Sequence, residues 1–372
     1  MRIAHISFHF AEYALNLSRA LAERHNVLTI LGRENVSSEL VEPLERARVG
    51  NLWLTTMRNF RLIDPRSAGN AIELGRAITR FQPHVVHCQE APTDYLIAAW
   101  PVIGRFPITL TIHDVKPHSG ADSQGRWRIE RYRSFLRRRA DAVIVHGAPA
   151  RAEAEGQMPW LKGRIFSAMH GPIGQGADFA SAGKPDWVPG RLLLFGRIEA
   201  YKGLGGLLDA LDILWRAGRT WTLCVAGRGS DLEQHRSRIL NSPHCQLIER
   251  FIRPDEIASL FRAAQIIVLP YLDATQSGIA AMALSYGRPA VATSTGSIPE
   301  LVRQGVNGFL VPPADPHALA TAIDRLLSEP ETCERFAKNA RDLAETEVSW
   351  RNIASNTTKV YRAAIKHRHR GL

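Results

Sequence analysis

A strand-like run in the second half of the chain is followed by two closely spaced cations. The apolar residues 192–195 precede Gly196 and Arg197, and Lys202 and Gly203 follow shortly after. The guanidinium of Arg197 can hold two phosphate oxygens at once, and the ammonium of Lys202 acts as a point charge. With a helix N-terminus beside them, such a pair suits a diphosphate. Ordinary surface cations would give the same pattern, so the fold must decide between them.

Two further segments repeat the order of strand, turn and helix start. Gly227 and Arg228 follow the aliphatic residues 223–226, and the glycine allows a backbone to come close to a nucleoside or phosphate. Ser277 is a natural N-cap for the apolar helix expected to begin at Gly278, whose free N–H groups can hold an anion. A tight turn and an ordinary capped helix are the plainer interpretations.

One histidine stands out in the first half of the chain. His113 and Asp114 end the strand-like run that begins at residue 108. An imidazole in this position can orient a ligand or carry a proton, although structural histidines occupy such positions too. The cysteines and the other histidines lack metal-ligand spacing, so no metal site is expected.

The elements that must position these residues form an α/β pattern. Short aliphatic runs alternate with segments of helical period, which is typical of parallel sheets with crossover helices. The expected strands are 3–7, 27–31, 52–55, 84–88, 108–113 and 142–145 in the first half, and 192–195, 222–226, 246–248, 266–269, 290–292 and 308–311 in the second. In open parallel sheets, ligands bind outside the carboxyl ends of the strands. The residues singled out above lie at those ends.

The 372 residues suit two domains, and a stretch rich in Gly and Pro separates them. We expect a first doubly wound domain over residues 1–172, a linker over 173–190 and a second doubly wound domain over 191–349. A last helix over 350–372 is expected to pack back on the first domain. The predicted fold class is α/β, with two Rossmann-like domains facing a central cleft.

Composition and charge exclude several classes of protein. With 45% hydrophobic and 22% charged residues, the chain is neither collagen-like nor largely disordered. No apolar run is long enough to cross a bilayer, and the N-terminus lacks the apolar core of a signal peptide. The four cysteines have no paired spacing, so a cytoplasmic location is expected. The net charge of +11 favours acidic partners, but no nucleic-acid motif accompanies it, so nucleic acid is not expected.

The basic excess is steepest over residues 116–139, which hold eight Lys and Arg and two acidic residues. The apolar side chains that interleave with these arginines are Trp127, Ile129, Tyr132, Phe135 and Leu136. This composition fits an interfacial helix over residues 126–139 on an anionic lipid surface. It fits a solvated cationic helix face equally well. The first interpretation would make the protein peripheral on the inner face of the plasma membrane.

Taken in order, these segments resemble the retaining glycosyltransferases of the GT-B fold, in the large family 4 (group 1). His113-Asp114 is similar to the family's strand-end H-D, whose His lies by the donor sugar. Gly196-Arg197 with Lys202-Gly203 resembles the family's G-R…K-G, which binds the donor diphosphate. Residues 287–308 resemble the family run G-x-P-V-V…G-G-x-P-E…G-x-x-G. The resemblance spans nearly the whole chain.

One motif departs from the family pattern. Ala274 and Met282 stand where the family has two Glu residues. The chain instead resembles a subgroup, linked to bacterial surface polysaccharides, with an acidic residue before T/S-Q-S-G, here Asp273 and residues 275–278. This implies Asp273 for the first carboxylate, with Asp114, Gln276 and Glu300 in supporting roles.

The first loop departs as well, because Phe8-His9-Phe10 replaces the family's double glycine.

The resemblance implies a hexosyltransferase that takes a nucleotide diphosphate sugar as donor and a lipid-linked or glycan acceptor, with no metal and no other cofactor. Arg197, Lys202 and the amides at Ser277 and Gly278 would hold the diphosphate, and Gly227-Arg228 would lie by the nucleoside. Two alternatives stay open at this point. One is a catalytically weak subunit that binds a nucleotide sugar, and the other is a nucleotide-sugar epimerase on the same fold.

Overall fold

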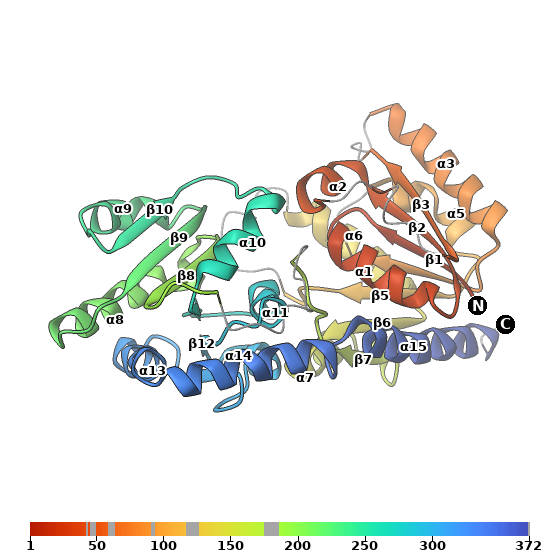
Figure 1. Cartoon of the computed structure of the whole chain (residues 1–372). Coiled ribbons are helices and arrows are strands. Elements are labelled where there is room, and N and C mark those ends of the chain that lie inside the picture. The colour runs from red at the N-terminus through yellow and green to blue at the C-terminus, as the bar shows by residue number, and fades with distance from the viewer. Residues whose placement is uncertain are drawn as a thin grey trace. The chain divides into compact units, whose positions relative to one another are not determined.

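The computed structural model describes residues 1–41, 44, 50–58, 64–90, 94–116, 126–174 and 186–370. The chain forms two compact units (Figure 1). The first is made of Met1–Pro117, Ala121–Met169 and Trp350–Leu372, and the second of His170–Ser349 with residues 118–120. Residues 175–185 of the expected linker lie outside the described ranges.

The first unit is built on a seven-stranded parallel sheet with the order β3-β2-β1-β4-β5-β6-β7. Its strands are β1 (Arg2–Ser7), β2 (Asn26–Gly32), β3 (Leu52–Met57), β4 (Val85–Gln89), β5 (Ile108–Ile112), β6 (Ala142–His146) and β7 (Ile165–Ala168). The chain order reverses between the neighbours β1 and β4. Ligands bind at such a switch point in open α/β sheets, so the loops after these strands are the natural site.

Helices cover both faces of this sheet. They are α1 (Ala11–Ala22), α2 (Arg33–Glu39), α3 (Arg66–Phe81), α4 (Asp94–Ala98), α5 (Trp100–Ile103), α6 (Arg126–Arg139), α7 (Ala148–Gln157) and α15 (Trp350–Arg370). Helix α15 comes from the far end of the chain and packs beside α1, with Ile353, Ala354 and Tyr361 buried in the same apolar cluster as Leu17 (Figure 1). The first unit thus needs the last segment of the chain to complete its core.

The second unit has a six-stranded parallel sheet with the order β10-β9-β8-β11-β12-β13. The strands are β8 (Arg191–Arg197), β9 (Thr222–Arg228), β10 (Cys245–Ile248), β11 (Ile266–Leu269), β12 (Ala290–Thr293) and β13 (Gly308–Val311). The helices are α8 (Leu204–Arg216), α9 (Leu232–Leu240), α10 (Pro254–Ala263), α11 (Gly278–Ser285), α12 (Ile298–Leu301), α13 (Pro316–Ser328) and α14 (Pro330–Glu345). Here the switch point lies between β8 and β11.

The sequence pattern explains why these elements form. Helix α8 buries Leu204, Leu207, Leu208, Leu211 and Leu214, whose spacing puts them on one helical face against the sheet. The central strands of the second sheet, β8 and β11, are mostly apolar because helices cover both sides of a parallel sheet. The central strands of the first sheet, β1 and β4, also carry buried polar residues. Among the helices that the structure describes, none combines the length and apolarity needed to span a bilayer.

All twelve expected strands are present, with ends that differ from the expected ones by up to two residues. Strand β7 was missed. Its four residues pair in parallel with β6, but only Ile165 among them is fully buried. A short edge strand with one buried apolar position gives too little periodic signal to be seen.

Candidate functional site

The loop after β8 and the loop after β11, at the switch point of the second sheet, pack against each other. Gly203, just before α8, has a φ of 70°, and a Cβ there would overlap the carbonyl oxygen of Pro270, which follows β11. The amide of Leu272 also donates to the carbonyl oxygen of Tyr201 at 2.7 Å. Glycine is therefore required at position 203 by both its backbone conformation and the close approach.

This contact places Lys202 at the centre of the carboxyl edge of the sheet. The Lys202 ammonium lies 3.6 Å from the ring centroid of Tyr271 and 5.1 Å from that of Tyr201. The Tyr271 ring is buried, and burial raises the pKa of its hydroxyl above the usual range. A cation over an aromatic face is attracted by the ring's negative face, so the two tyrosines hold the lysine head group in this loop.

Arg197 and Arg228 end adjacent strands in the same register. The two residues are paired across β8 and β9, and both side chains are exposed. Laterally paired residues of a parallel sheet project from the same face. Glycine is required at position 227, where φ is 147° and a Cβ would overlap the carbonyl oxygen of Gly196. The glycine permits two strand ends to approach each other.

The N-terminus of α11 adjoins this edge. Ser277 is the N-cap, as the sequence predicts, and its Oγ accepts a hydrogen bond from the Ala280 amide at 3.2 Å. A Cβ at Gly196 would lie 3.5 Å from the side chain of Ile279, in the first turn of the helix. The first-turn N–H groups of an α-helix, including that of Gly278, lack intrahelical partners and carry partial positive charge. The strand-end cations and this helix terminus therefore gather on one edge.

The loop before α11 is held by the loop after β12. The amide of Ser297 donates to the carbonyl oxygen of Thr275 at 3.0 Å, and Gly296 packs backbone to backbone on Ala274. Within this contact, the buried Gln276 Oε1 and Thr295 Oγ1 have no hydrogen-bond partner among the described residues. A buried polar atom without a partner costs free energy, and such atoms mark places where a ligand or water binds.

The carboxylates and their replacements occupy different environments. Asp273 is exposed, whereas Ala274 and Met282 are 7% and 6% exposed and pack in the interior. Glu300 lies half-buried in α12. A carboxylate at position 274 or 282 would need buried partners, and apolar side chains fill these two places instead.

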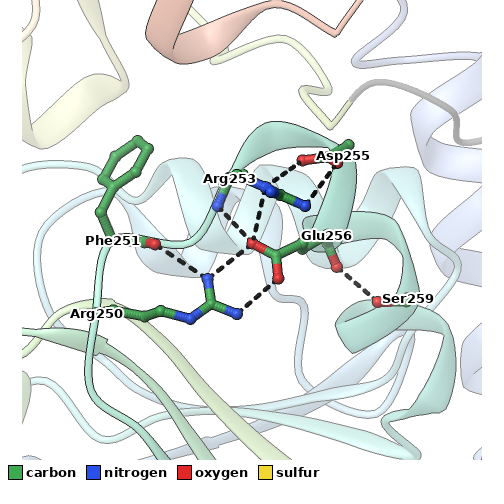
Figure 2. Close-up of polar contacts among 6 residues, drawn as sticks. All are labelled: Arg250, Phe251, Arg253, Asp255, Glu256 and Ser259. Carbon is green, nitrogen blue, oxygen red and sulfur yellow. Dashed lines mark hydrogen bonds and ion pairs between the residues drawn. The ribbon is translucent and has the colours of Figure 1, made fainter.

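The loop after β10 brings a feature that the sequence analysis missed. Arg250 donates a hydrogen bond to each carboxylate oxygen of Glu256, at 2.8 and 2.6 Å (Figure 2). Glu256 also accepts a hydrogen bond from the Arg253 amide at the start of α10. The hydrogen bond from Arg250 lowers the pKa of Glu256 to about 2. Phe251, between these residues, is 52% exposed. In the sequence, Glu three residues after Arg253 and just before an apolar helical run is a capping-box pattern that could have drawn attention to this loop.

In the first unit, His113 follows β5 and is almost fully buried. Its Nε2 lies 2.7 Å from Oε1 of Gln89, the last residue of β4. The Phe10 ring stacks on it with centroids 3.8 Å apart, and the rings of Tyr13 and His146 lie at 5.2 and 4.8 Å. His113 is thus packed and hydrogen-bonded, and Asp114 beside it is half-buried.

Phe10 adopts a backbone conformation that glycine favours. Its φ is 60° and its ψ is 49°, which is the left-handed region, at the N-cap of α1. The family that the sequence resembles has a double glycine in this loop. The loop keeps a glycine-like backbone here and places an aromatic ring over His113, at a cost of about 1–3 kcal/mol in backbone strain.

A network of buried polar side chains lies behind His113. The His5 and His87 rings stack with centroids 4.5 Å apart, and His87 bonds to the Tyr361 hydroxyl at 2.8 Å and to Thr111 Oγ1 at 2.7 Å. Burial lowers the pKa of His5 to about 3 and that of His87 well below its usual range. Both rings are therefore neutral near neutral pH.

A buried ion pair fixes the loop that carries His113. Glu90, just after β4, accepts from Arg137 Nε and Nη2 at 2.7 Å each. The same guanidinium donates to the carbonyl oxygens of Val115 and Asp114 at 3.2 and 3.3 Å. Arg137 therefore joins the ends of β4 and β5, and the sequence analysis assigned it no such role.

Three of the apolar residues expected on a lipid-facing helix over residues 126–139 are described. Tyr132 and Leu136 are 3% and 1% exposed and belong to the core of the first unit, and Phe135 packs edge-on against Trp100. The side chains at 127 and 129 lie outside the described residues. Tyr132, Phe135 and Leu136 therefore face the core and would not enter a lipid surface, and the association of residues 126–139 with a membrane stays a prediction.

Within the described ranges, no three His, Cys, Asp or Glu side chains are grouped so that they could hold a metal ion. The chemistry that these residues can supply is therefore binding by cations, amide N–H groups and neutral imidazoles. Cations and oriented amides stabilise an anionic leaving group, because they are already in place when its charge develops.

Comparisons with known proteins decide the class of the chain. Residues 11–165 match the family model "Glycosyltransferase Family 4", and residues 189–329 match "Glycosyl transferases group 1". These two models cover most of both units. The chain is a glycosyltransferase. Its two Rossmann-like domains have the GT-B fold, as the sequence predicts.

Named relatives of this glycosyltransferase agree. It is 28% identical to the glycogen synthase of Mycobacterium tuberculosis over 76% of this chain and 70% of the relative. It is 29% identical to an uncharacterized glycosyltransferase of Methanocaldococcus jannaschii over 47% of this chain and 45% of that protein, and so spans less than half the length of this relative. A D-inositol 3-phosphate glycosyltransferase of Streptomyces griseus is 38% identical over 31% of this chain and 25% of its own.

Solved structures match the whole glycosyltransferase chain. A glycosyltransferase from Rickettsia africae has a TM-score of 0.69 at 17% identity and covers 98% of both chains. Sucrose-phosphate synthase from Thermosynechococcus elongatus has a TM-score of 0.69 at 20% identity, covering 97% of this chain and 98% of its own. HepE of Anabaena, solved with UDP-glucose, has a TM-score of 0.67 at 16% identity, covering 98% of this chain and all of that one.

Proposed function

We propose that this glycosyltransferase moves a hexose, with retention, from a nucleotide diphosphate sugar to a lipid-linked or glycan acceptor in bacterial surface polysaccharide synthesis. The observation that carries the proposal is the gathering of Arg197, Lys202 and the α11 N-terminus at the switch point of the second sheet. The Anabaena structure with bound UDP-glucose supports a nucleotide sugar as the donor class. The T-Q-S-G motif of residues 275–278 supports the polysaccharide subgroup.

In this proposal the bond between the anomeric carbon and the diphosphate breaks, and its electron pair goes to the diphosphate oxygen. Arg197 and Lys202 stabilise the charge that develops there, together with the Ser277 and Gly278 amides. The acceptor oxygen bonds to the anomeric carbon from the same face, and its proton passes to the leaving phosphate. His113 orients the sugar, and its neighbours keep the ring packed. No metal is needed in this scheme, because the cations replace it.

Asp273 is proposed to contact the donor sugar, with Gln276 and Glu300 as supporting residues and Gly227-Arg228 beside the nucleoside. The buried Gln276 Oε1, which lacks a partner among the described residues, supports a ligand at this loop. The exposed position of Asp273 at the same sheet edge supports its role.

The test is calorimetric titration with UDP, GDP, ADP and dTDP. Arg197→Ala and Lys202→Ala should each weaken binding of the preferred nucleotide by about 1.5–3 kcal/mol, roughly 10- to 150-fold in Kd. Arg216→Ala is the matched control, because Arg216 is an exposed arginine at the far end of α8. Equal affinity in the wild type and both site variants would overturn the diphosphate assignment. Turnover of the matching nucleotide sugar with a lipid-linked acceptor then tests transfer.

A further inference from the structure

Gln89 bridges two buried histidines of the first unit. It is the last residue of β4, between β1 and β5 in the sheet, and its side chain is buried. Its Oε1 lies 2.7 Å from His113 Nε2, and its Nε2 lies 2.9 Å from His5 Nε2. One amide group thus contacts both imidazoles.

The bridge dictates where the protons lie. An amide NH₂ group only donates, so His5 Nε2 accepts, and the proton of this neutral ring sits on Nδ1. That nitrogen lies 2.8 Å from Ser18 Oγ, which also accepts from the Thr29 hydroxyl at 2.7 Å. The amide oxygen only accepts, so His113 Nε2 must donate to it. The hydrogen bond to His5 therefore fixes the amide nitrogen of Gln89 and leaves its Oε1 facing His113.

We propose that Gln89 is a positioning residue for His113, which holds the imidazole proton on Nε2 and prevents the ring from turning over. The inference rests on the proposed function, because it gives a reason why the orientation of His113 matters for transfer. Phe10 and His146 pack on the ring and limit its tilt. Packing alone leaves two ring orientations related by a half-turn, and the hydrogen bond to Gln89 selects one of them.

The test compares three variants of the full chain. Gln89→Met keeps a straight side chain of similar size and removes both hydrogen bonds, whereas Gln89→Glu keeps an acceptor oxygen for His113. Tyr361→Phe is the matched control, because it removes one buried hydrogen bond from His87 without touching Gln89 or His113. The ¹⁵N NMR signals of His113, assigned through His113→Gln, report which ring nitrogen carries the proton.

We expect the wild type and Gln89→Glu to keep the proton on Nε2, and Gln89→Met to show both tautomers in exchange. With the preferred nucleotide sugar, Gln89→Met should lower kcat about 10- to 100-fold, by analogy with the partners that orient metal-ligating histidines, with little change in KM. Tyr361→Phe should lower the melting temperature to a similar extent but leave kcat and the His113 signals unchanged.

Three results would overturn the inference. These are a wild-type proton on Nδ1, an unchanged kcat and spectrum in Gln89→Met, or an equal loss of kcat in Tyr361→Phe. A wild-type protein that transfers no sugar would overturn the proposed function, and with it the role in turnover. The proton position on His113 is measured without substrate, so the two failures can be told apart.

Discussion

Replacing Arg137 by Met should destabilise the first unit strongly. The guanidinium makes two charged hydrogen bonds of 2.7 Å to Glu90, whose side chain is 4% exposed, and two more to carbonyl oxygens. The variant leaves the buried carboxylate without its two short hydrogen bonds, with the Arg133 Nε at 3.6 Å as its remaining cation among the described residues. Removing one member of a buried ion pair costs about 3–5 kcal/mol, and two charged hydrogen bonds at about 1.5–3 kcal/mol each give a similar figure.

Urea denaturation with hydrogen exchange by mass spectrometry measures this loss and locates it. Amides of β5 and of residues 113–116 should exchange faster in Arg137→Met. Arg139→Met is the matched control on the same helix, because Arg139 is exposed, and its effect should stay within about 0.5 kcal/mol. The double variant Glu90→Gln with Arg137→Met should be more stable than Arg137→Met, because a neutral amide costs less to bury than a carboxylate.

A loss below about 1 kcal/mol in Arg137→Met would place the pair in the range of exposed ion pairs and refute the reasoning. Acceleration of exchange only in α6, with the residues after β5 unchanged, would refute the claim that Arg137 joins the two strand ends. Equal stability of the single and double variants would show that the buried carboxylate carries no penalty.

Further predictions concern the loop that carries Lys202, the pH dependence of the free energy of unfolding and the effect of removing metal ions. Gly203→Ala should weaken nucleotide binding in calorimetry as Lys202→Ala does, because the added Cβ overlaps the Pro270 carbonyl and displaces the lysine loop. Burial lowers the pKa of His5 to about 3 and of His170 to about 4, so the unfolded chain binds more protons below its own histidine pKa. The free energy of unfolding should therefore be nearly flat between about pH 7 and 8 and should fall between pH 6.5 and 4.5, by about 1.4 kcal/mol per pH unit for each proton taken up, as urea titrations at several pH values would reveal. A pH-independent free energy in this window would contradict the burial of these rings. EDTA should leave the transfer rate unchanged, and a loss restored by a divalent cation would refute the metal-free scheme.

Replacing Phe10 by Gly tests the loop over His113. Glycine should relieve about 1 kcal/mol or more of backbone strain at a φ of 60°, but it also removes the ring that stacks on His113. We therefore expect a small change in melting temperature together with a lower kcat. A large loss of stability would show that the ring packing outweighs the strain.

The sequence by itself determined the α/β architecture and the position of Arg197, Lys202 and Ser277 at the carboxyl edge of the second sheet. Short runs of apolar residues predict the strands, because parallel strands are buried on both faces and their sequences are apolar along most of their length. Residues just after such runs, such as Arg197 and Lys202, must reach the carboxyl edge of the sheet. Ser277 as the N-cap of α11 follows from local chemistry alone, because capping depends on a few neighbouring residues.

The tertiary structure alone decided what the basic stretch and the polar strand residues do. The sequence of α6 does not reveal that Arg137 is buried, because the neighbouring arginines of the same helix are exposed. Its partner Glu90 is 47 residues away. The bridge from His5 through Gln89 to His113 likewise joins three strands, and sheet order places them side by side. Such contacts depend on long-range packing, whereas a sequence pattern reports only local periodicity.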